Sequence, residues 1–253
     1  MNKKYILFDL DGTLTDSGEG ITKSVVYALE KFGIKATPEE VKHFVGPPLK
    51  ENFMLSYNLT EEQATDAVEY FRERYAPIGI FENYPYEGIK ELLKELKEKG
   101  SVLLVATSKP MVHAERVLEK FELYTYFDCV LGSELHGTEN KTHIMKQVLE
   151  KAEVKNLSEV IMVGDTIYDI EGARNVGVDV IAVGYGYGKK EELKQADYFA
   201  ETVNRHGGDV TIVDLPKIGL YGNTHFIFSD TNNDKVAENI LSWMHEKGLD
   251  AEE

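Results

Sequence analysis

Apolar residues recur with two different periods along this chain. Residues 5–8 form a continuous apolar run of strand length, which ends at Asp9 before Gly12 breaks the pattern. From residue 16 to about residue 77, apolar positions follow helical spacing. Two capping-box patterns, at residues 37–40 and 60–63, mark helix starts, and the first predicts a short helix ending near Phe44. We therefore expect one strand followed by an all-α block.

From Gly88 onward, helical and strand-like segments alternate. The pattern predicts helices at residues 88–99, 111–120, 142–152 and 169–176, and strands at residues 101–106, 128–131, 160–163 and 178–183. Such alternation is typical of a parallel sheet that helices cover on both faces. We expect an α/β core in residues 1–15 and 85–203. The all-α block, residues 16–84, is then an insertion placed to cover the catalytic end of the sheet.

The composition argues against some classes of partner and indicates the cellular compartment. The chain has 253 residues, 42% of them hydrophobic, which is enough for one large or two modest domains. Its 44 acidic and 28 basic residues give a net charge of -16, which repels nucleic acids and anionic membranes. Cys129 is the single cysteine, so an internal disulfide is excluded. No signal peptide or membrane span is evident, and we expect a cytoplasmic protein.

Polar side chains follow the carboxyl ends of the predicted strands. In chain order they are Asp9, Asp11, Thr107, Ser108, Lys141, Asp165 and Asp169. Carboxyl ends of parallel strands line the ligand crevice of such sheets. A carboxylate that attacks phosphorus needs a hard divalent cation against anion repulsion, and Mg²⁺ suits oxygen ligands. Hydroxyl and amide groups at residues 107–108 can bind phosphate oxygens, and Lys141 adds positive charge. The pattern indicates a phosphoryl-transfer site.

Some of these residues also have ordinary structural interpretations. Thr107 could be a turn residue at a strand end, and Lys141 a solvated lysine at a helix start. Asp169 is as readily a helix N-cap as a member of a metal shell. Lys50, after two prolines, is either a substrate contact from the helical block or a surface lysine. The glycines at residues 184, 186 and 188 lack the dinucleotide-binding spacing, which favours a mobile loop.

Four motifs in order resemble the haloacid dehalogenase superfamily of phosphatases. They are the segment 9–13 (Asp-Leu-Asp-Gly-Thr), Thr107 after an apolar strand, Lys141, and the segment 164–169 (Gly-Asp-Thr-Ile-Tyr-Asp). The resemblance covers residues 1 to about 203. It implies a Rossmann-like core with a helical cap inserted after the first motif. Residues 20–24 and 46–49 resemble the subgroup of phosphoglycolate phosphatases and related 5′-nucleotidases.

The resemblance also implies a role for each residue. Asp9 would be the nucleophile that forms an aspartyl-phosphate, and Asp11 the general acid and then the base. Thr107, Ser108 and Lys141 would bind the phosphoryl group. Asp165, Asp9 and the main-chain carbonyl of Asp11 would ligate Mg²⁺, with Asp169 in the outer shell. The expected substrate is a small phosphorylated metabolite, and the expected assembly is a monomer or homodimer.

Residues 204–253 do not fit this family pattern. Residues 209–215 read as a strand and residues 236–246 as an amphipathic helix, and the segment resembles the end of an α/β-hydrolase esterase. His225 would be the triad base there, but no serine has the G-x-S-x-G flanks of a nucleophile elbow. We interpret the segment either as a fused or misassembled fragment or as an extra βα unit, and we include it in the fold class as an extra C-terminal βα segment. Its apolar helix face, with Trp243, must be buried on the sheet's flank or in a second subunit.

Three alternatives to a phosphatase remain at this point. A sugar phosphomutase of the same fold would pass the phosphoryl group to a sugar instead of water. A catalytically silent binding or regulatory protein would fit the unusual tail. A serine esterase is disfavoured, since it lacks the nucleophile elbow.

Overall fold

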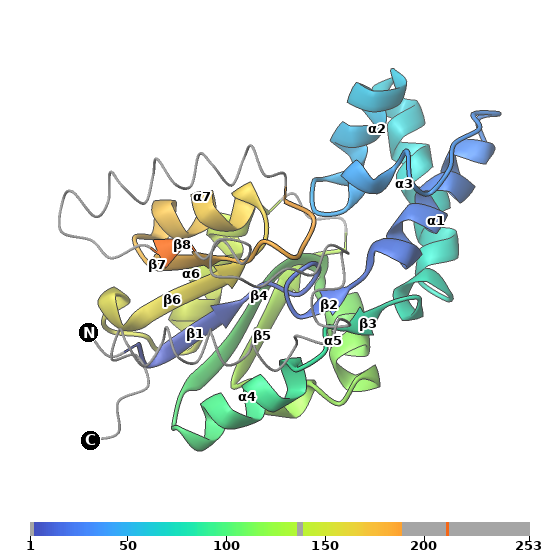
Figure 1. The fold of residues 1–253 in the computed structure, drawn as a ribbon. Helices are drawn as coiled ribbons and strands as arrows, with labels where there is room; N and C mark the ends of the chain where they lie inside the picture. The colour runs from blue at the N-terminus through green and yellow to red at the C-terminus, as the bar shows by residue number, and fades with distance from the viewer. Residues whose placement is uncertain (1–2, 136–138, 189–210, 213–253) are drawn as a thin grey trace. The chain divides into compact units, whose positions relative to one another are not determined.

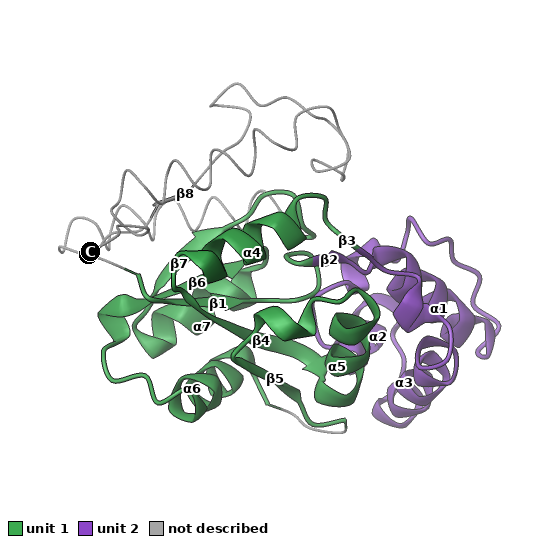
Figure 2. Ribbon diagram, turned by 90° about the horizontal axis from the view of Figure 1, so that it is seen from below, with its two compact units in different colours: residues 1–14, 85–253 green, residues 15–84 purple. Residues whose placement is uncertain are grey.

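The computed structural model describes residues 3–135, 139–188 and 211–212 (Figure 1). The chain forms two compact units, which Figure 2 shows in different colours. Unit 1 consists of residues 1–14 and 85–253, and unit 2 of residues 15–84. In the part of the chain that the structure describes, no helix is both long and apolar enough to cross a membrane.

Unit 1 is built on a parallel sheet with the strand order β5-β4-β1-β6-β7-β8. The strands are β1 (Tyr5–Phe8), β4 (Val102–Pro110), β5 (Cys129–Ser133), β6 (Val160–Gly164), β7 (Asp179–Ala182) and β8 (Thr211–Ile212). Strand β1 is central, with Tyr5 aligned with Val102 on one side and Val160 on the other. The strand order changes direction beside β1, and ligands of such sheets bind at that point.

Helices cover both faces of this sheet (Figure 1). They are α4 (Ile89–Glu98), α5 (Met111–Lys120), α6 (Lys141–Lys151) and α7 (Ile167–Val176), with 3₁₀ turns η3 (Tyr124–Tyr126) and η4 (Leu157–Glu159). The side chains of successive strand residues point to opposite faces of the sheet. On one face, Leu7 and Met162 belong to the same buried hydrophobic cluster as Ile144 of α6. The predicted α/β fold is confirmed. Strand β8 pairs with β7 inside the segment expected to be a strand, whereas the predicted helix at residues 236–246 lies outside the described residues.

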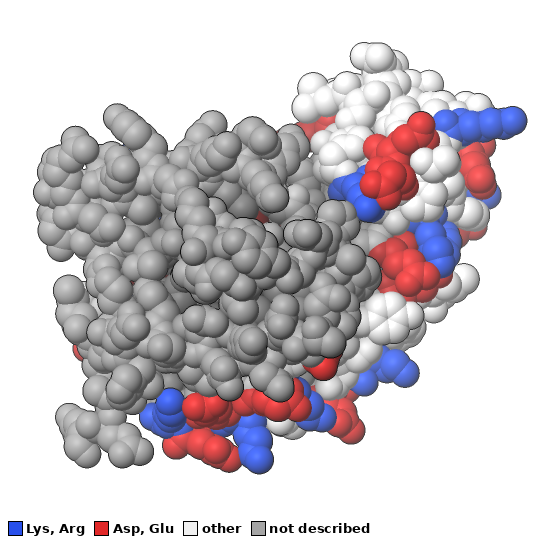
Figure 3. Space-filling model, in the orientation of Figure 1, with Lys and Arg blue, Asp and Glu red and all other residues white. Residues whose placement is uncertain are grey.

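Unit 2 is mainly helical. It contains α1 (Gly18–Glu30), α2 (Leu49–Tyr57), α3 (Glu61–Tyr75) and the 3₁₀ turns η1 (Lys42–Phe44) and η2 (Gly79–Phe81). A two-stranded ribbon pairs β2 (Thr15–Asp16) with β3 (Tyr84–Pro85), whose second residue belongs to unit 1. Thr60 caps α3 as predicted, because its hydroxyl accepts the Gln63 amide at 3.2 Å. Where described residues are visible in Figure 3, acidic and basic side chains are interleaved. Within unit 2, Arg74 pairs with Glu82 at 2.8 Å.

The helix expected from residue 37 to about Phe44 is not formed. The reciprocal bonds of its capping box are present, since the Thr37 amide donates to Glu40 at 2.7 Å. Only the 3₁₀ turn Lys42–Phe44 follows, however. Eight residues separate Thr37 from Gly46, and a helix this short gains too few hydrogen bonds to offset its nucleation.

Candidate active site

Three buried carboxylates from distant parts of the sequence meet at the carboxyl end of the central strands. Asp9 follows β1, Asp165 follows β6, and Asp169 lies in the first turn of α7. One oxygen from each lies within 4.8 Å of the others. Asp165 and Asp169 are fully buried, and Asp9 is nearly so. The sheet register places these acids together, because β1 pairs directly with β6.

Lys141 is the cation of this cluster. It is the first residue of α6, whose N-cap Asn140 accepts the His143 amide at 2.9 Å. Its Nζ lies 2.7 Å from Asp9 Oδ1 and 2.8 Å from Asp169 Oδ1. It also donates to the Ala106 carbonyl at 3.1 Å. The three contacts match the three N–H bonds of an ammonium group, so Lys141 is a buried member of the site rather than a solvated lysine.

Asp165 is held by two donors and by close backbone packing. Thr13 Oγ1 donates to its Oδ1 at 2.9 Å, and the Tyr187 amide donates to its Oδ2 at 2.8 Å. Gly12, at a φ of +82°, and Gly186 approach the carboxylate so closely that a Cβ at either position would overlap Oδ2. Residues 184–188, expected only as a loop, therefore form part of the wall around Asp165.

Asp169 serves both as a helix cap and as a member of the acidic cluster. Its Oδ2 accepts the Thr166 amide at 3.0 Å and the Thr166 hydroxyl at 2.9 Å, while its Oδ1 faces Lys141. The N-cap residue of α7 is Thr166, and Asp169 is its partner one turn later. Of the two interpretations of Asp169, the one that makes it the N-cap residue is wrong, since Thr166 holds that position.

Asp11 has its own buried lysine. Its Oδ2 lies 2.9 Å from Nζ of Lys109, and the two side chains are 15% and 3% exposed. The Lys109 amide also donates to Thr107 Oγ1 at 3.2 Å, so this pair and the buried Thr107 form one group. Ser108 is exposed, and its carbonyl accepts the Ser133 hydroxyl at 2.9 Å. Sequence reasoning missed Lys109 and Thr13, although both lie inside or next to the motifs used.

The electrostatics of the site favour an additional positive charge. Burial raises the pKa of Asp9 to about 6, although Lys141 opposes the shift. Burial, together with Asp169 and Asp9, also raises the pKa of Asp165. The four acids, including Asp11, face two ammonium groups, which leaves two negative charges in excess. Oxygen donors with such an excess suit a hard divalent cation.

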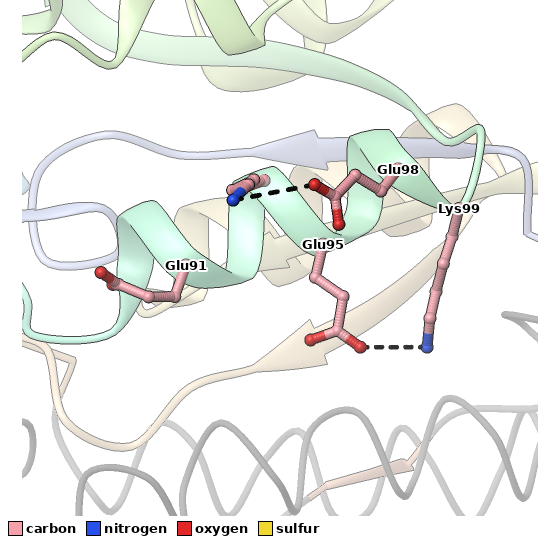
Figure 4. A pocket seen from close by; sticks show the side chains of 5 residues that line it. Glu91, Glu95, Glu98 and Lys99 are labelled. Atoms are coloured by element: carbon pink, nitrogen blue, oxygen red, sulfur yellow. Dashed lines mark ion pairs between the residues drawn. The ribbon is translucent and has the colours of Figure 1, made fainter.

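Two other features are not members of this cluster. Lys50 belongs to α2 of unit 2, where it pairs with Glu61 at 3.0 Å and is 43% exposed. A pocket beside α4 is lined by Glu91, Lys94, Glu95, Glu98 and Lys99 (Figure 4). Ion pairs within the helix neutralise much of its charge, as in the Lys99–Glu95 pair at 3.2 Å. None of the five lining residues is buried, in contrast to the acidic cluster.

Comparison with known proteins identifies close relatives. A family model described as haloacid dehalogenase-like hydrolase matches residues 6–183. A 5′-nucleotidase from Pseudomonas aeruginosa is 44% identical over 75% of this chain and 86% of its own length. A tyrosine-protein kinase, PtkA, from Mycobacterium tuberculosis is 35% identical over 82% of this chain and 70% of its own. Phosphoglycolate phosphatases from two Vibrio species are also related, at 30 and 31% identity.

Comparison with solved structures also identifies phosphatases. A crystal structure described as a predicted phosphatase from Clostridium acetobutylicum is 40% identical, with a TM-score of 0.77. The alignment covers 96% of this chain and all of that one. The resemblance drawn from the four motifs is thereby confirmed.

Proposed function

Because the chain belongs to the haloacid dehalogenase-like hydrolases and is a phosphatase, we propose that it hydrolyses small phosphomonoesters through an aspartyl-phosphate on Asp9. The observation that carries the proposal is the cluster of Asp9, Asp165 and Asp169 around Lys141. A carboxylate attacking a phosphate ester must overcome repulsion between anions, and this cluster is where a divalent cation fits. The chemistry then proceeds as two displacements.

In the first displacement, an Asp9 oxygen forms a bond to phosphorus as the ester oxygen leaves. Asp11 gives its proton to that leaving oxygen. In the second, Asp11 takes a proton from water, whose oxygen then attacks phosphorus and releases Asp9. Lys141 holds Asp9 in place and, with Thr107 and the amide of Ser108, binds the phosphoryl oxygens.

Mg²⁺ is the cation that we propose for this site. Asp9, Asp165 and the main-chain carbonyl of Asp11 would hold it, with Asp169 in the outer shell. When bound, it supplies positive charge to the phosphoryl oxygens. The donors offered to it are all oxygens, which suits magnesium better than softer metals.

The relatives guide the choice of substrate. Those named 5′-nucleotidase and phosphoglycolate phosphatase lead us to propose a nucleoside monophosphate or a small phosphorylated acid. Residues 16–84 would act as a cap that selects the substrate, with Lys50 as a candidate contact. The single cysteine and the strong net negative charge support a cytoplasmic protein without nucleic-acid or membrane partners, monomeric or homodimeric.

A second candidate is phosphoryl transfer to an acceptor other than water. The relative named as a tyrosine-protein kinase favours keeping it, and a phosphomutase would be of this kind. Inorganic phosphate accumulates only when water is the acceptor. The esterase alternative rests on His225, which lies outside the described residues.

The test is a screen for phosphate release with Mg²⁺ from phosphoglycolate, nucleoside monophosphates, sugar phosphates and pyrophosphate. Asp9→Asn should abolish release while the fold is kept, whereas Asp66→Asn, at an exposed position, should leave it unchanged. EDTA should abolish phosphate release, and added Mg²⁺ should restore it. Full activity of the Asp9 variant, or of the metal-stripped protein, would refute the mechanism. Loss of substrate without phosphate release would favour the transferase.

A further inference from the structure

We propose that Lys109 is the positioning residue for Asp11, and that it holds oxygen Oδ2 so that oxygen Oδ1 exchanges the proton with the leaving group and with water. The inference rests on the proposed function, in which Asp11 is the general acid. It adds a second lysine to the site, with a task separate from that of Lys141.

The backbone of Lys109 is held from two sides. Strand β4 continues to Pro110, and its register against β5 shifts between Thr107 and Pro110. Thr107 accepts the Lys109 amide at 3.2 Å on one side. On the other, the chain packs so tightly on β5 that a Cβ at Gly132 would overlap the Lys109 carbonyl oxygen. These contacts fix where the Lys109 side chain starts.

The side chain then runs through the interior to a carboxylate oxygen of Asp11. Lys109 is 7% exposed as a residue, and its Nζ lies 2.9 Å from Asp11 Oδ2. A buried ammonium needs a charged or polar partner, so the pair is costly to separate. Asp11 Oδ1 is buried and has no hydrogen-bond partner among the described residues. The two oxygens of Asp11 are therefore inequivalent.

This inequivalence determines the path of the proton. When the ester bond breaks, the proton on Oδ1 moves to the leaving oxygen and the new negative charge spreads onto Oδ2, beside Lys109. When water attacks, Oδ1 takes the proton back. Without Lys109 the carboxyl group can rotate, and correct placement of an acid contributes much of its rate effect.

The experiment compares two substrates by kcat/KM, which reports the first displacement. Ethyl phosphate has a poor leaving group that needs a proton, whereas p-nitrophenyl phosphate does not. Lys109→Met should lower kcat/KM for ethyl phosphate by about 10²-fold and for p-nitrophenyl phosphate by less than about 3-fold. Lys109→Arg keeps a cation there and should recover most of the loss. Lys90→Met, which breaks a surface pair with Glu122, should change neither substrate.

Each outcome decides between explanations. An equal loss on both substrates would overturn the proposal, since it would mean that Lys109 binds the phosphoryl group or supports the fold. In an Asp11→Asn background, Lys109→Met should have no further effect on the ratio of the two kcat/KM values, and a further fall would also overturn it. If the unmodified protein releases phosphate from neither substrate, the proposed function has failed instead.

Discussion

Replacing Asp165 with asparagine should stabilise the metal-free protein while removing its activity. The amide keeps the shape of the carboxylate, and its oxygen can still accept the Tyr187 amide. Acidic oxygens of Asp9 and Asp169 lie within 4.8 Å. At that distance, and with an effective dielectric constant of about 20, each like-charge pair costs about 3 kcal/mol. The hydrogen bonds that Thr13 and the Tyr187 amide donate to the ionised carboxylate offset about half of this repulsion, so the substitution should gain about 3 kcal/mol.

Thermal unfolding in EDTA at pH 8 measures this gain. For a protein of this size, a gain of about 3 kcal/mol raises Tm by roughly 6–12 °C. Burial raises the pKa of Asp165 in the folded state above its ordinary value of 3.8. The penalty that asparagine removes is therefore present above pH 3.8 and shrinks as the pH falls toward it. The Tm difference should be smaller at pH 5.5 than at pH 8.

Two controls accompany this measurement. Asp66→Asn makes the same change at an exposed site and should shift stability by less than about 0.5 kcal/mol. Added Mg²⁺ should raise the Tm of the unmodified protein, by ligand linkage, but not that of the Asp165 variant. A lower Tm for Asp165→Asn in EDTA would refute the reasoning, because it would show that the ionised carboxylate is already compensated without metal.

Three further predictions follow from the packing. Gly186→Ala should weaken Mg²⁺ binding, measured by calorimetry, because its Cβ would displace Asp165; Gly184→Ala, with open space around the added Cβ, should not. Lys141→Met should lower the free energy of unfolding by about 3–5 kcal/mol, because it removes the cation from two buried carboxylates. Urea titrations measure this loss, and a smaller loss than that of the surface variant Lys90→Met would contradict the prediction. Thr60→Ala should cost about 1 kcal/mol and leave activity per folded molecule unchanged; an activity loss would give Thr60 another role.

The sheet and its polar edge could be predicted from the sequence because both depend on local patterns. Buried parallel strands are continuous apolar runs, and the side chains that follow them necessarily share one edge. Lys109 was missed because the second strand was expected to end at Ala106. The strand in fact runs on to Pro110, and the alternation of Thr107, Ser108 and Lys109 between inside and outside continues the strand period.

Long-range packing accounts for what no local pattern indicated. Gly186 and Gly188 leave room for the backbone to pass against Asp165, and that approach depends on how β6 and β7 lie in the sheet. The short helix expected before Phe44 shows the opposite error, since a correct capping signal stood at the start of too short a segment. Local chemistry marks where a helix starts, and the available length decides whether it continues.

The split of unit 1 across the sequence has a consequence for synthesis on the ribosome. Unit 2 is one uninterrupted stretch, residues 15–84, so it can fold as soon as it has left the exit tunnel. Strand β1 can pair on both sides only after its neighbours β4 and β6 have been translated, and β6 begins at Val160. Asp9 thus lacks its partners on the neighbouring strand until β6 and residues 165–169 have been translated, and the acidic centre closes only after that.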